Sequence, residues 1–318
     1  VERVQTYVRA GDLLLSDVPD DSGKNVRSLQ ATVLASLYNE FDRPLEAKIR
    51  VASLPTGWKP IIGKYTIPRF PAGARKDAKL VIEGLDVPVT FDGKMPLTLD
   101  VLAEPNTRKR LRTEVAFIVA GHFNTPPVID GKLDDWPIRP RAAAGSFRLL
   151  GRRGQINSAN QNTGGLAKRQ TLAFAMQDED NLYFAFRCAE PNMDRLVVHH
   201  NNIVRYEQLL ACGEDLVEIL LDPGAKASGP EDLYHILVKP NGVAVQEIGI
   251  HTNPPLGRAR PFPLGAKVAV SRQKDYWSVE LAIPRSAFGL DGKEPFWGVN
   301  FTRFSPQGLE ASSWSGAS

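Results

Sequence analysis

Short apolar runs broken by turn-forming residues dominate this sequence from end to end. Apolar side chains tend to alternate with polar ones, whereas the three-to-four-residue spacing of an amphipathic helix is scarce. The breaks are rich in asparagine, aspartate, glycine and proline, and the chain contains 26 glycines and 24 prolines. Many short strands need many turns, and these residues form turns. The sequence therefore predicts an all-β fold.

Length and composition indicate two ordinary globular domains. The chain has 318 residues, of which 42% are hydrophobic and 24% charged, and domains commonly span about 100–200 residues. A net charge of +3, spread along the chain, is too small to indicate a nucleic acid or an anionic membrane as partner. No apolar run approaches the ~18 residues of a membrane span. The chain opens at Val1, so we expect it to be a piece of a longer polypeptide.

The first part of the chain, 1–122, is expected to be one sandwich. Seven strands separated by turn-rich joints are a pattern typical of immunoglobulin-like sandwiches. These strands are expected at 3–8, 29–38, 47–53, 61–67, 79–85, 97–103 and 113–119.

A short motif after the strand expected at 47–53 resembles that of a known family. Leu54-Pro-Thr-Gly57-Trp58 follows a strand, a polar corner and a returning strand. This arrangement resembles the NEW3-like sandwich modules found beside bacterial glycosidases and sugar-binding modules. The resemblance covers much of 28–104 and implies that Trp58 packs at one end of the sandwich.

A linker and a second domain follow. Pro126 and Pro127 favour extended backbone and interrupt strand pairing, as a domain joint requires. We therefore expect a second domain at 123–318. It contains an Asp-Gly turn at Asp130, an acidic hairpin turn at Asp178 and an Asn-Gly turn at Asn241. Its five recognisable pieces, in order, are 128–136, 171–187, 213–223, 233–243, and 276–284 together with 297–303 and 312–315.

All five pieces, in this order, resemble a family 9 carbohydrate-binding module. The resemblance implies a jelly-roll-type β-sandwich after the immunoglobulin-like one. It also implies non-catalytic binding of a polysaccharide or glycan, as an accessory region of a larger secreted, periplasmic or cell-surface protein. Two alternatives stay open: a structural or protein-interaction module that has lost its sugar clamp, and a haem-binding relative of the same sandwich. The oligomeric state is not predicted.

Family 9 sites resemble a clamp of two tryptophans around a terminal sugar, with polar side chains on its hydroxyls. Cys212 stands where the first clamp tryptophan is expected, and the apolar Leu237 lies near the position of an arginine. Glu218 matches a retained polar contact. Trp136, Trp277, Trp297 and Trp314 match framework positions and are expected to pack. The candidate sugar contacts are Glu218, Tyr206, Tyr234, Tyr276 and Trp314.

No spacing of carboxylates or of serine, histidine and aspartate singles out a catalytic site, so we expect no enzyme activity. Asp215 and Glu218 lie three apart near one strand and should point to opposite faces. Glu280 is expected to pair with a lysine or arginine of a neighbouring strand. Cys188 and Cys212 could close one disulfide or remain free thiols.

Calcium is the one ion that the sequence suggests, because acidic turns supply the oxygen ligands it prefers. Family 9 modules often hold structural calcium, which the resemblance extends to this chain. The two candidate turns contain Asp178 with Asp180, and Asp130 with Asp134. The haem alternative would need a methionine and a second ligand; Met176 and Met193 are the methionines of this domain, and His199, His200, His235 and His251 are its candidate partners.

Overall fold

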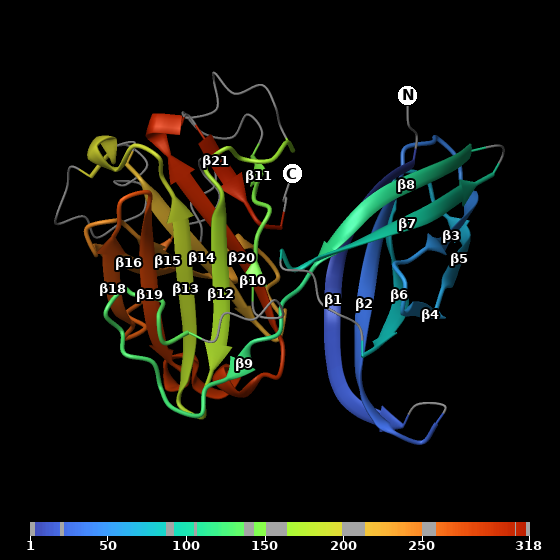
Figure 1. Cartoon of the computed structure of the whole chain (residues 1–318). Helices are drawn as coiled ribbons and strands as arrows, with labels where there is room; N and C mark the ends of the chain where they lie inside the picture. Colours follow the sequence, from blue (N-terminus) through green and yellow to red (C-terminus); the bar gives the residue numbers. More distant parts are fainter. Residues whose placement is uncertain are drawn as a thin grey trace. The chain divides into compact units, whose positions relative to one another are not determined.

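The structure is a computed structural model of the chain, and two compact units make it up (Figure 1). One comprises Val1–Thr90 and Lys94–Phe117, and the other comprises Phe91–Gly93 and Ile118–Ser318. We describe each by itself, as the first and second domain. The residues that the structure describes are 4–19, 22–86, 92–104, 107–136, 143–150, 164–198, 214–249, 259–308 and 310–315.

The all-β prediction is confirmed. Strands form four sheets, and in the described ranges neighbouring strands pair antiparallel, except β9, which pairs parallel with β12. Outside the strands, regular structure in the described ranges is confined to 3₁₀ turns, and no helix there is long and apolar enough to cross a membrane. The turns are η3 (Met193–Arg195), η4 (Pro230–Asp232), η5 (Arg285–Lys293) and η6 (Pro306–Gly308).

The first domain consists of two four-stranded sheets. One has the order β1-β2-β6-β4: β1 (Val4–Pro19), β2 (Asn25–Asn39), β6 (Arg75–Leu85) and β4 (Trp58–Ile62). The other has the order β5-β3-β7-β8: β5 (Lys64–Phe70), β3 (Leu45–Ser53), β7 (Lys94–Ala103) and β8 (Thr107–Ala116).

Alternation along the strands builds the core of the first domain. Val33 of β2, Ile82 of β6, Ile49 of β3 and Val101 of β7 belong to one buried cluster that joins both sheets. Trp58 packs against this cluster, with its ring 6.0 Å from that of Phe117 at an interplanar angle of 62°. This is the packing role that the sequence indicates for Trp58.

The second domain is a larger sandwich, shown in green to red in Figure 1. The first sheet has the order β10-β12-β13-β19-β18, with β9 beside β12: β9 (Gly121–His122), β10 (Ala143–Ala144), β12 (Thr171–Gln177), β13 (Asn181–Ala189), β18 (Lys267–Arg272) and β19 (Tyr276–Pro284). The second has the order β11-β21-β20-β14-β15-β16-β17: β11 (Arg148–Leu149), β14 (Leu216–Pro223), β15 (Tyr234–Val238), β16 (Ala244–Ile248), β17 (Arg260–Pro261), β20 (Trp297–Ser305) and β21 (Glu310–Ser313).

Aromatic side chains fill the space between these two sheets. Phe186 of β13 meets Phe301 of β20 edge to face, with ring centroids 5.6 Å apart. Trp277 and Trp314 are fully buried, and the Trp314 indole packs 5.7 Å from Phe301. Side chains of a strand alternate between two faces, so each sheet also has an outer face that points away from this core.

The outer face of the six-stranded sheet is covered by the segment that enters the second domain. Phe123 and Trp136 pack edge to face on it, with ring centroids 5.4 Å apart. Underneath lie Phe174 of β12 and Tyr183 of β13. The outer face of the seven-stranded sheet carries several buried charged side chains, among them Glu214, Glu218 and Lys239.

Three residues just before β7, Phe91–Gly93, belong to the second domain. The carbonyl of Asp92 accepts hydrogen bonds from the Trp314 Nε1 at 2.7 Å and from the Gly145 backbone N–H at 3.0 Å. Gly93 follows with φ of +67°, a conformation that suits glycine, and a Cβ there would lie 2.9 Å from the Trp314 ring.

Candidate functional site

The candidate site is a set of polar side chains on the outer face of the seven-stranded sheet. Glu218 of β14 alternates with Val217 and Ile219, which point into the core. Strand register places Glu218 beside Leu237 of β15 and Thr302 of β20. We name this set the polar face, and its members are Glu214, Glu218, His235, Lys239, Glu247 and Thr302, each at most 5% exposed.

Glu218 is the centre of the polar face. The hydroxyl of Thr302 donates to Glu218 Oε2, and His235 Nε2 lies 3.7 Å from Glu218 Oε1. Oε1 is buried and accepts no hydrogen bond from any residue in the described ranges. A buried carboxylate oxygen with unused hydrogen-bonding capacity is costly, and a ligand hydroxyl is one group that could use it.

A buried ion pair flanks Glu218 on the same face. Lys239, just after β15, contacts the carboxylate of Glu214, just before β14, and both side chains are fully buried. Glu247 of β16 is paired in register with His235. The polar face therefore has charges of both signs held in fixed positions by neighbouring strands.

Apolar side chains form the next row of this outer face. Leu216, Leu237 and Val245 pack in one buried cluster with Phe304 and Ala311. The face thus presents hydrogen-bonding groups beside an apolar strip. A sugar ring has the same two-sided character, with hydroxyls at its edge and C–H groups on its faces.

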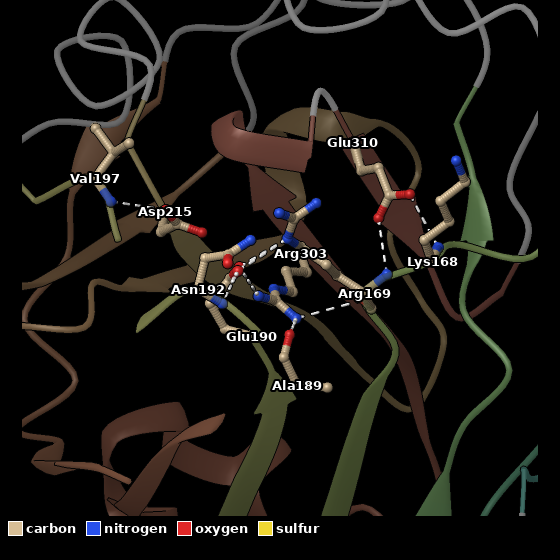
Figure 2. Close-up of polar contacts among 9 residues, drawn as sticks. All are labelled: Lys168, Arg169, Ala189, Glu190, Asn192, Val197, Asp215, Arg303 and Glu310. Carbon is tan, nitrogen blue, oxygen red and sulfur yellow. Dashed lines mark hydrogen bonds and ion pairs between the residues drawn. The ribbon is translucent and has the colours of Figure 1, made fainter. Parts of the chain in front are cut away.

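A second group of charges lies between the two sheets, at one end of the sandwich (Figure 2). Arg303 of β20 donates through Nη1 to the Ala189 carbonyl at 2.7 Å, and its Nη2 lies 3.4 Å from Glu190 Oε2. Arg169 Nε donates to the same carboxylate oxygen at 2.8 Å. Glu190 and Arg303 are each 1% exposed. These ion pairs join β13, β20 and the residues before β12, and their role is to hold that end of the sandwich together.

Asp215 lies beside this ion cluster and forms two hydrogen bonds with the backbone of Val197. Its carboxylate accepts the Val197 N–H at 3.0 Å, while its own backbone N–H donates to the Val197 carbonyl at 3.0 Å. Burial, opposed by the Val197 N–H and by Arg303, raises the pKa of Asp215 to about 6. Asp215 points to the core side of the sheet, whereas Glu218 points outward, so the two lie on opposite faces, as their spacing predicts.

The structure does not bring the predicted sugar contacts together. Tyr234 packs against Phe288, with rings 4.9 Å apart, and its position in β15 is on the core side of the sheet that holds Glu218. Tyr276 is in the other sheet, where the Arg187 guanidinium lies 4.1 Å from the centre of its ring. Trp314 is buried in the core, and Tyr206 lies outside the described residues.

Sequence reasoning identified Glu218 and missed the rest of the polar face. Glu214 lies four residues before Glu218, and Lys239 lies four residues after His235, so each pair shares one face of an extended chain. This even spacing of charged residues was the sequence signal that could have indicated the polar face. It was hidden because Leu216 and Leu237 occupy the intervening positions on the same face.

The expectation that Glu280 pairs with a lysine or arginine is wrong. Glu280 accepts hydrogen bonds from Trp136 Nε1 at 2.7 Å, the Asp130 N–H at 2.9 Å and the Gly131 N–H at 2.6 Å. Asp130 and Gly131 form the Asp-Gly turn that lies over β19. Glu280 therefore anchors the covering segment through two backbone groups and an indole.

The carboxylates of the two acidic turns bind groups of their own turns. Asp178 accepts the Asn181 N–H at 2.6 Å and the Tyr183 hydroxyl at 2.5 Å. Burial alone would raise the pKa of Asp178, but these hydrogen bonds outweigh it and lower the pKa. Asp130 accepts the Lys132 N–H at 2.8 Å. In the described ranges, no group of three histidine, cysteine, aspartate or glutamate side chains gathers as a metal site would require. Calcium at Asp178 with Asp180, or at Asp130 with Asp134, remains a hypothesis.

Cys188 is a buried free thiol of β13, and burial raises its pKa to about 11. Cys212 lies outside the described residues. Of the haem candidates, Met176 belongs to β12 and His235 to β15, in different sheets. His199, His200 and His251 are outside the described residues.

Comparison with known proteins gives similarity to solved structures only. No protein family matches the chain, and no curated protein does. A family 9 carbohydrate-binding module from Caldicellulosiruptor kristjanssonii in complex with cellotriose is 19% identical, with a TM-score of 0.39, over 62% of this chain and 84% of that one. The same type of module from that organism in complex with glucose is also 19% identical, over the same shares of the two chains, with a TM-score of 0.38.

A third similar structure is a carbohydrate-binding protein, so described provisionally, from Bacteroides uniformis. It is 11% identical, with a TM-score of 0.34, over 54% of this chain and 76% of that one. The first two structures belong to the family that the sequence of the second domain resembles. Such low TM-scores and identities do not indicate what this chain binds, so its site is assigned from its own contacts.

Proposed function

We propose that the second domain is a non-catalytic carbohydrate-binding module and that its glycan contacts the polar face through Glu218. The observation that carries this proposal is the buried Glu218 carboxylate, whose Oε1 accepts no hydrogen bond from the described residues. A sugar hydroxyl donates readily to a carboxylate, and such a charge-assisted hydrogen bond is about twice as strong as a neutral one.

The surroundings of Glu218 support a sugar over a cation or an aliphatic ligand. His235 lies 3.7 Å from the open oxygen and can share a hydroxyl with it, since an imidazole nitrogen donates or accepts. Lys239 is held by Glu214, so the charge of one of the three carboxylates of the polar face is balanced. Leu237 and Val245 add the apolar strip that the C–H face of a sugar ring needs.

The pairing of the carboxylates supports binding without catalysis. Glycosidases place two carboxyl groups about 5–9.5 Å apart on one cleft. Asp215, the ionisable neighbour of Glu218 in sequence, points to the opposite face of the sheet and holds Val197. Glu214 is ion-paired with Lys239. With this function we expect the protein to be secreted, periplasmic or at the cell surface, where polysaccharides occur.

Affinity electrophoresis of the whole chain in gels that contain soluble polysaccharides tests the proposal. Cellulose derivatives, mixed-linkage glucan and xylan are the polymers to compare, with cellotriose and glucose as free competitors. We expect retardation by at least one neutral polymer. Glu218→Gln keeps the side-chain shape and an acceptor for Thr302 but removes the charge, and should weaken binding by about tenfold, as the loss of a charge-assisted hydrogen bond predicts.

Glu231→Gln is the matched control, because Glu231 is an exposed residue of η4 in the same domain. It should bind as the unchanged protein does. Absence of retardation on every polymer, or equal retardation of Glu218→Gln and the unchanged protein, would overturn the assignment. Retention of a co-purifying protein with no glycan binding would favour the interaction module instead.

A further inference from the structure

Positive charge gathers on one face of the first domain, the outer face of the sheet β5-β3-β7-β8. Strand register aligns Lys64, Arg50, Asp100 and Arg110 in one row across the four strands. Their neighbours on β3 and β7, Ile49 and Val101, point into the core, so this row points outward. Arg108 and Arg112 continue it along β8. We name Arg50, Lys64, Arg108, Arg110 and Arg112 the arginine face.

A single carboxylate organises the arginine face. Arg110 donates to Asp100 through Nε at 2.8 Å and Nη2 at 3.2 Å, and Arg50 donates through Nη2 at 2.9 Å. Arg108 lies 3.8 Å away. The hydrogen bonds from Arg110 and then Arg50 lower the pKa of Asp100, so this carboxylate stays ionised. The Asp100 side chain is 0% exposed, whereas those of Arg50, Arg108 and Arg110 are 50%, 64% and 57% exposed.

Most of the charge on this face is uncompensated. Three guanidinium groups share the one charge of Asp100. Arg112 and Lys64 are exposed and make no ion pair or hydrogen bond with any described residue. Of the other acidic residues near this sheet, Glu46 contacts Lys48, Glu114 lies 3.5 Å from Lys94, and the charge of Glu104 acts on Lys48. Fixed, exposed and unneutralised arginines attract anions.

We propose that the arginine face binds a polysaccharide that carries carboxylate groups. Guanidinium forks bind carboxylates side-on, and Asp100 already shows this geometry with Arg110. Arg108, Arg110 and Arg112 occupy alternate positions of one strand, about 7 Å apart, so they present a straight row of positive charges to an extended chain with regularly spaced acids. This is a second binding surface, in a different domain from the polar face.

Two observations favour a polysaccharide over a nucleic acid. The outward positions of β7 and β8 around this row hold Thr98, Leu102 and Glu114 rather than aromatic residues, whereas single-stranded nucleic acids are bound by stacking of bases on aromatic rings. The net charge of the whole chain is only +3, far from the strongly basic footprint of a protein that binds duplex phosphates.

Binding of the whole chain to polygalacturonate, measured by affinity electrophoresis and calorimetry, tests the proposal. We expect binding that weakens as NaCl rises from about 0.05 to 0.5 M, because the Debye length shrinks over this range. Arg108→Gln with Arg112→Gln should raise the Kd about 25-fold, at about fivefold for each exposed cation removed. These two positions leave Arg50 and Arg110 to satisfy Asp100, so the melting temperature should not change.

Lys76→Gln with Lys79→Gln is the matched control, because it removes two exposed cations from β6 in the other sheet of the same domain. It should bind polygalacturonate as the unchanged protein does. The proposal is overturned if the control lowers affinity as much as the arginine pair does, or if no polygalacturonate binding occurs at low salt. Tighter binding to dextran sulfate or to a DNA oligonucleotide would also overturn it. Glu218→Gln should leave polygalacturonate binding intact, and the arginine pair should leave neutral glucan binding intact, so failure here and failure of the proposed glycan site are distinguishable.

Discussion

The indole Nε1 of Trp136 donates a hydrogen bond of 2.7 Å to Oε1 of Glu280, 144 residues further along the chain. The other carboxylate oxygen of Glu280 accepts the backbone N–H groups of Asp130 and Gly131. One buried acidic side chain thus fixes the segment that covers the six-stranded sheet.

Glu280→Ala should destabilise the protein strongly, because three donors, two of them in buried hydrogen bonds, lose their acceptor. We expect a loss of about 3–5 kcal/mol, equivalent to a fall in Tm of roughly 6–20 °C for a domain of this size. Thermal unfolding followed by circular dichroism measures the shift. Glu231→Ala, at an exposed site, should change Tm by little; an equal shift in both variants would contradict the role given to Glu280.

Asp215 should make stability depend on pH between about 4 and 6. Its pKa is raised from 3.8 to about 6 in the folded protein, so the stabilising contribution of the protonated form is fully present below 3.8 and is lost as pH rises through 6. The size of this contribution is about 3 kcal/mol, from about 1.4 kcal/mol per pH unit. Denaturant unfolding between pH 4 and 7 measures it.

Asp215→Asn keeps an acceptor for the Val197 N–H and removes the titration. Its free energy of unfolding should therefore fall less than that of the unchanged protein over the same pH range. The charged groups that influence Asp215, Arg303 and Glu190, remain in both proteins. Parallel pH profiles for the two would show that Asp215 titrates normally.

Glu190→Ala should be more harmful than a surface substitution, because it removes the carboxylate that lies 3.4 Å from the buried guanidinium of Arg303. Removing one member of a buried ion pair costs about 3–5 kcal/mol. Glu190→Gln, which still accepts from Arg169, should cost less than Glu190→Ala. Chemical denaturation of the three proteins checks this order, and an alanine variant as stable as the unchanged protein would contradict it.

Gly131 should tolerate no side chain. Its φ is +87°, and a Cβ would lie 2.5 Å from the carbonyl carbon of Val270 and 2.6 Å from Ser271 N. Gly242 has a similar φ of +84° but open space around it. Gly242→Ala should therefore cost only about 1 kcal/mol of conformational strain, and Gly131→Ala clearly more. Equal Tm values for the two variants would count against the close packing of this turn on β18.

Calcium removal should leave Tm within about 1 °C. Asp178 uses both carboxylate oxygens within its own hairpin, and Asp130 binds Lys132. Both carboxylates therefore have partners without a calcium ion. Differential scanning calorimetry with excess chelator, then with added CaCl₂, measures the effect. A shift of several degrees that calcium reverses would restore the structural-ion hypothesis.

Much of the fold could be predicted from period-two patterning and turn residues. The hairpin at 171–187 corresponds to β12 and β13, and 276–284 corresponds to β19. The strand expected at 113–119 begins at Thr107 in the structure. The sequence did not predict this earlier start, because the run from Arg108 to Arg112 is mostly charged and shows no apolar face. β4, with four of its five residues exposed, gave no burial pattern to detect.

The site was less predictable, because its members come from different strands. Glu218 was found through its motif, but its neighbours His235 and Thr302 are brought to it only by strand register. Register depends on all the pairings of the sheet, and the local sequence does not contain it. The NEW3-like character of the first domain and the sugar contacts at Tyr206, Tyr234, Tyr276 and Trp314 stay predictions.

Asp92, in the short stretch between β6 and β7, has a consequence for domain shuffling. Recombination at residue 118 would move the second sandwich into a new protein without the carbonyl that receives the Trp314 indole and the Gly145 N–H. Two orphaned buried donors are a burden of about 1–3 kcal/mol each. Inheritance of the second sandwich as a cassette therefore favours a break upstream of Asp92, which carries β7 and β8 along with it.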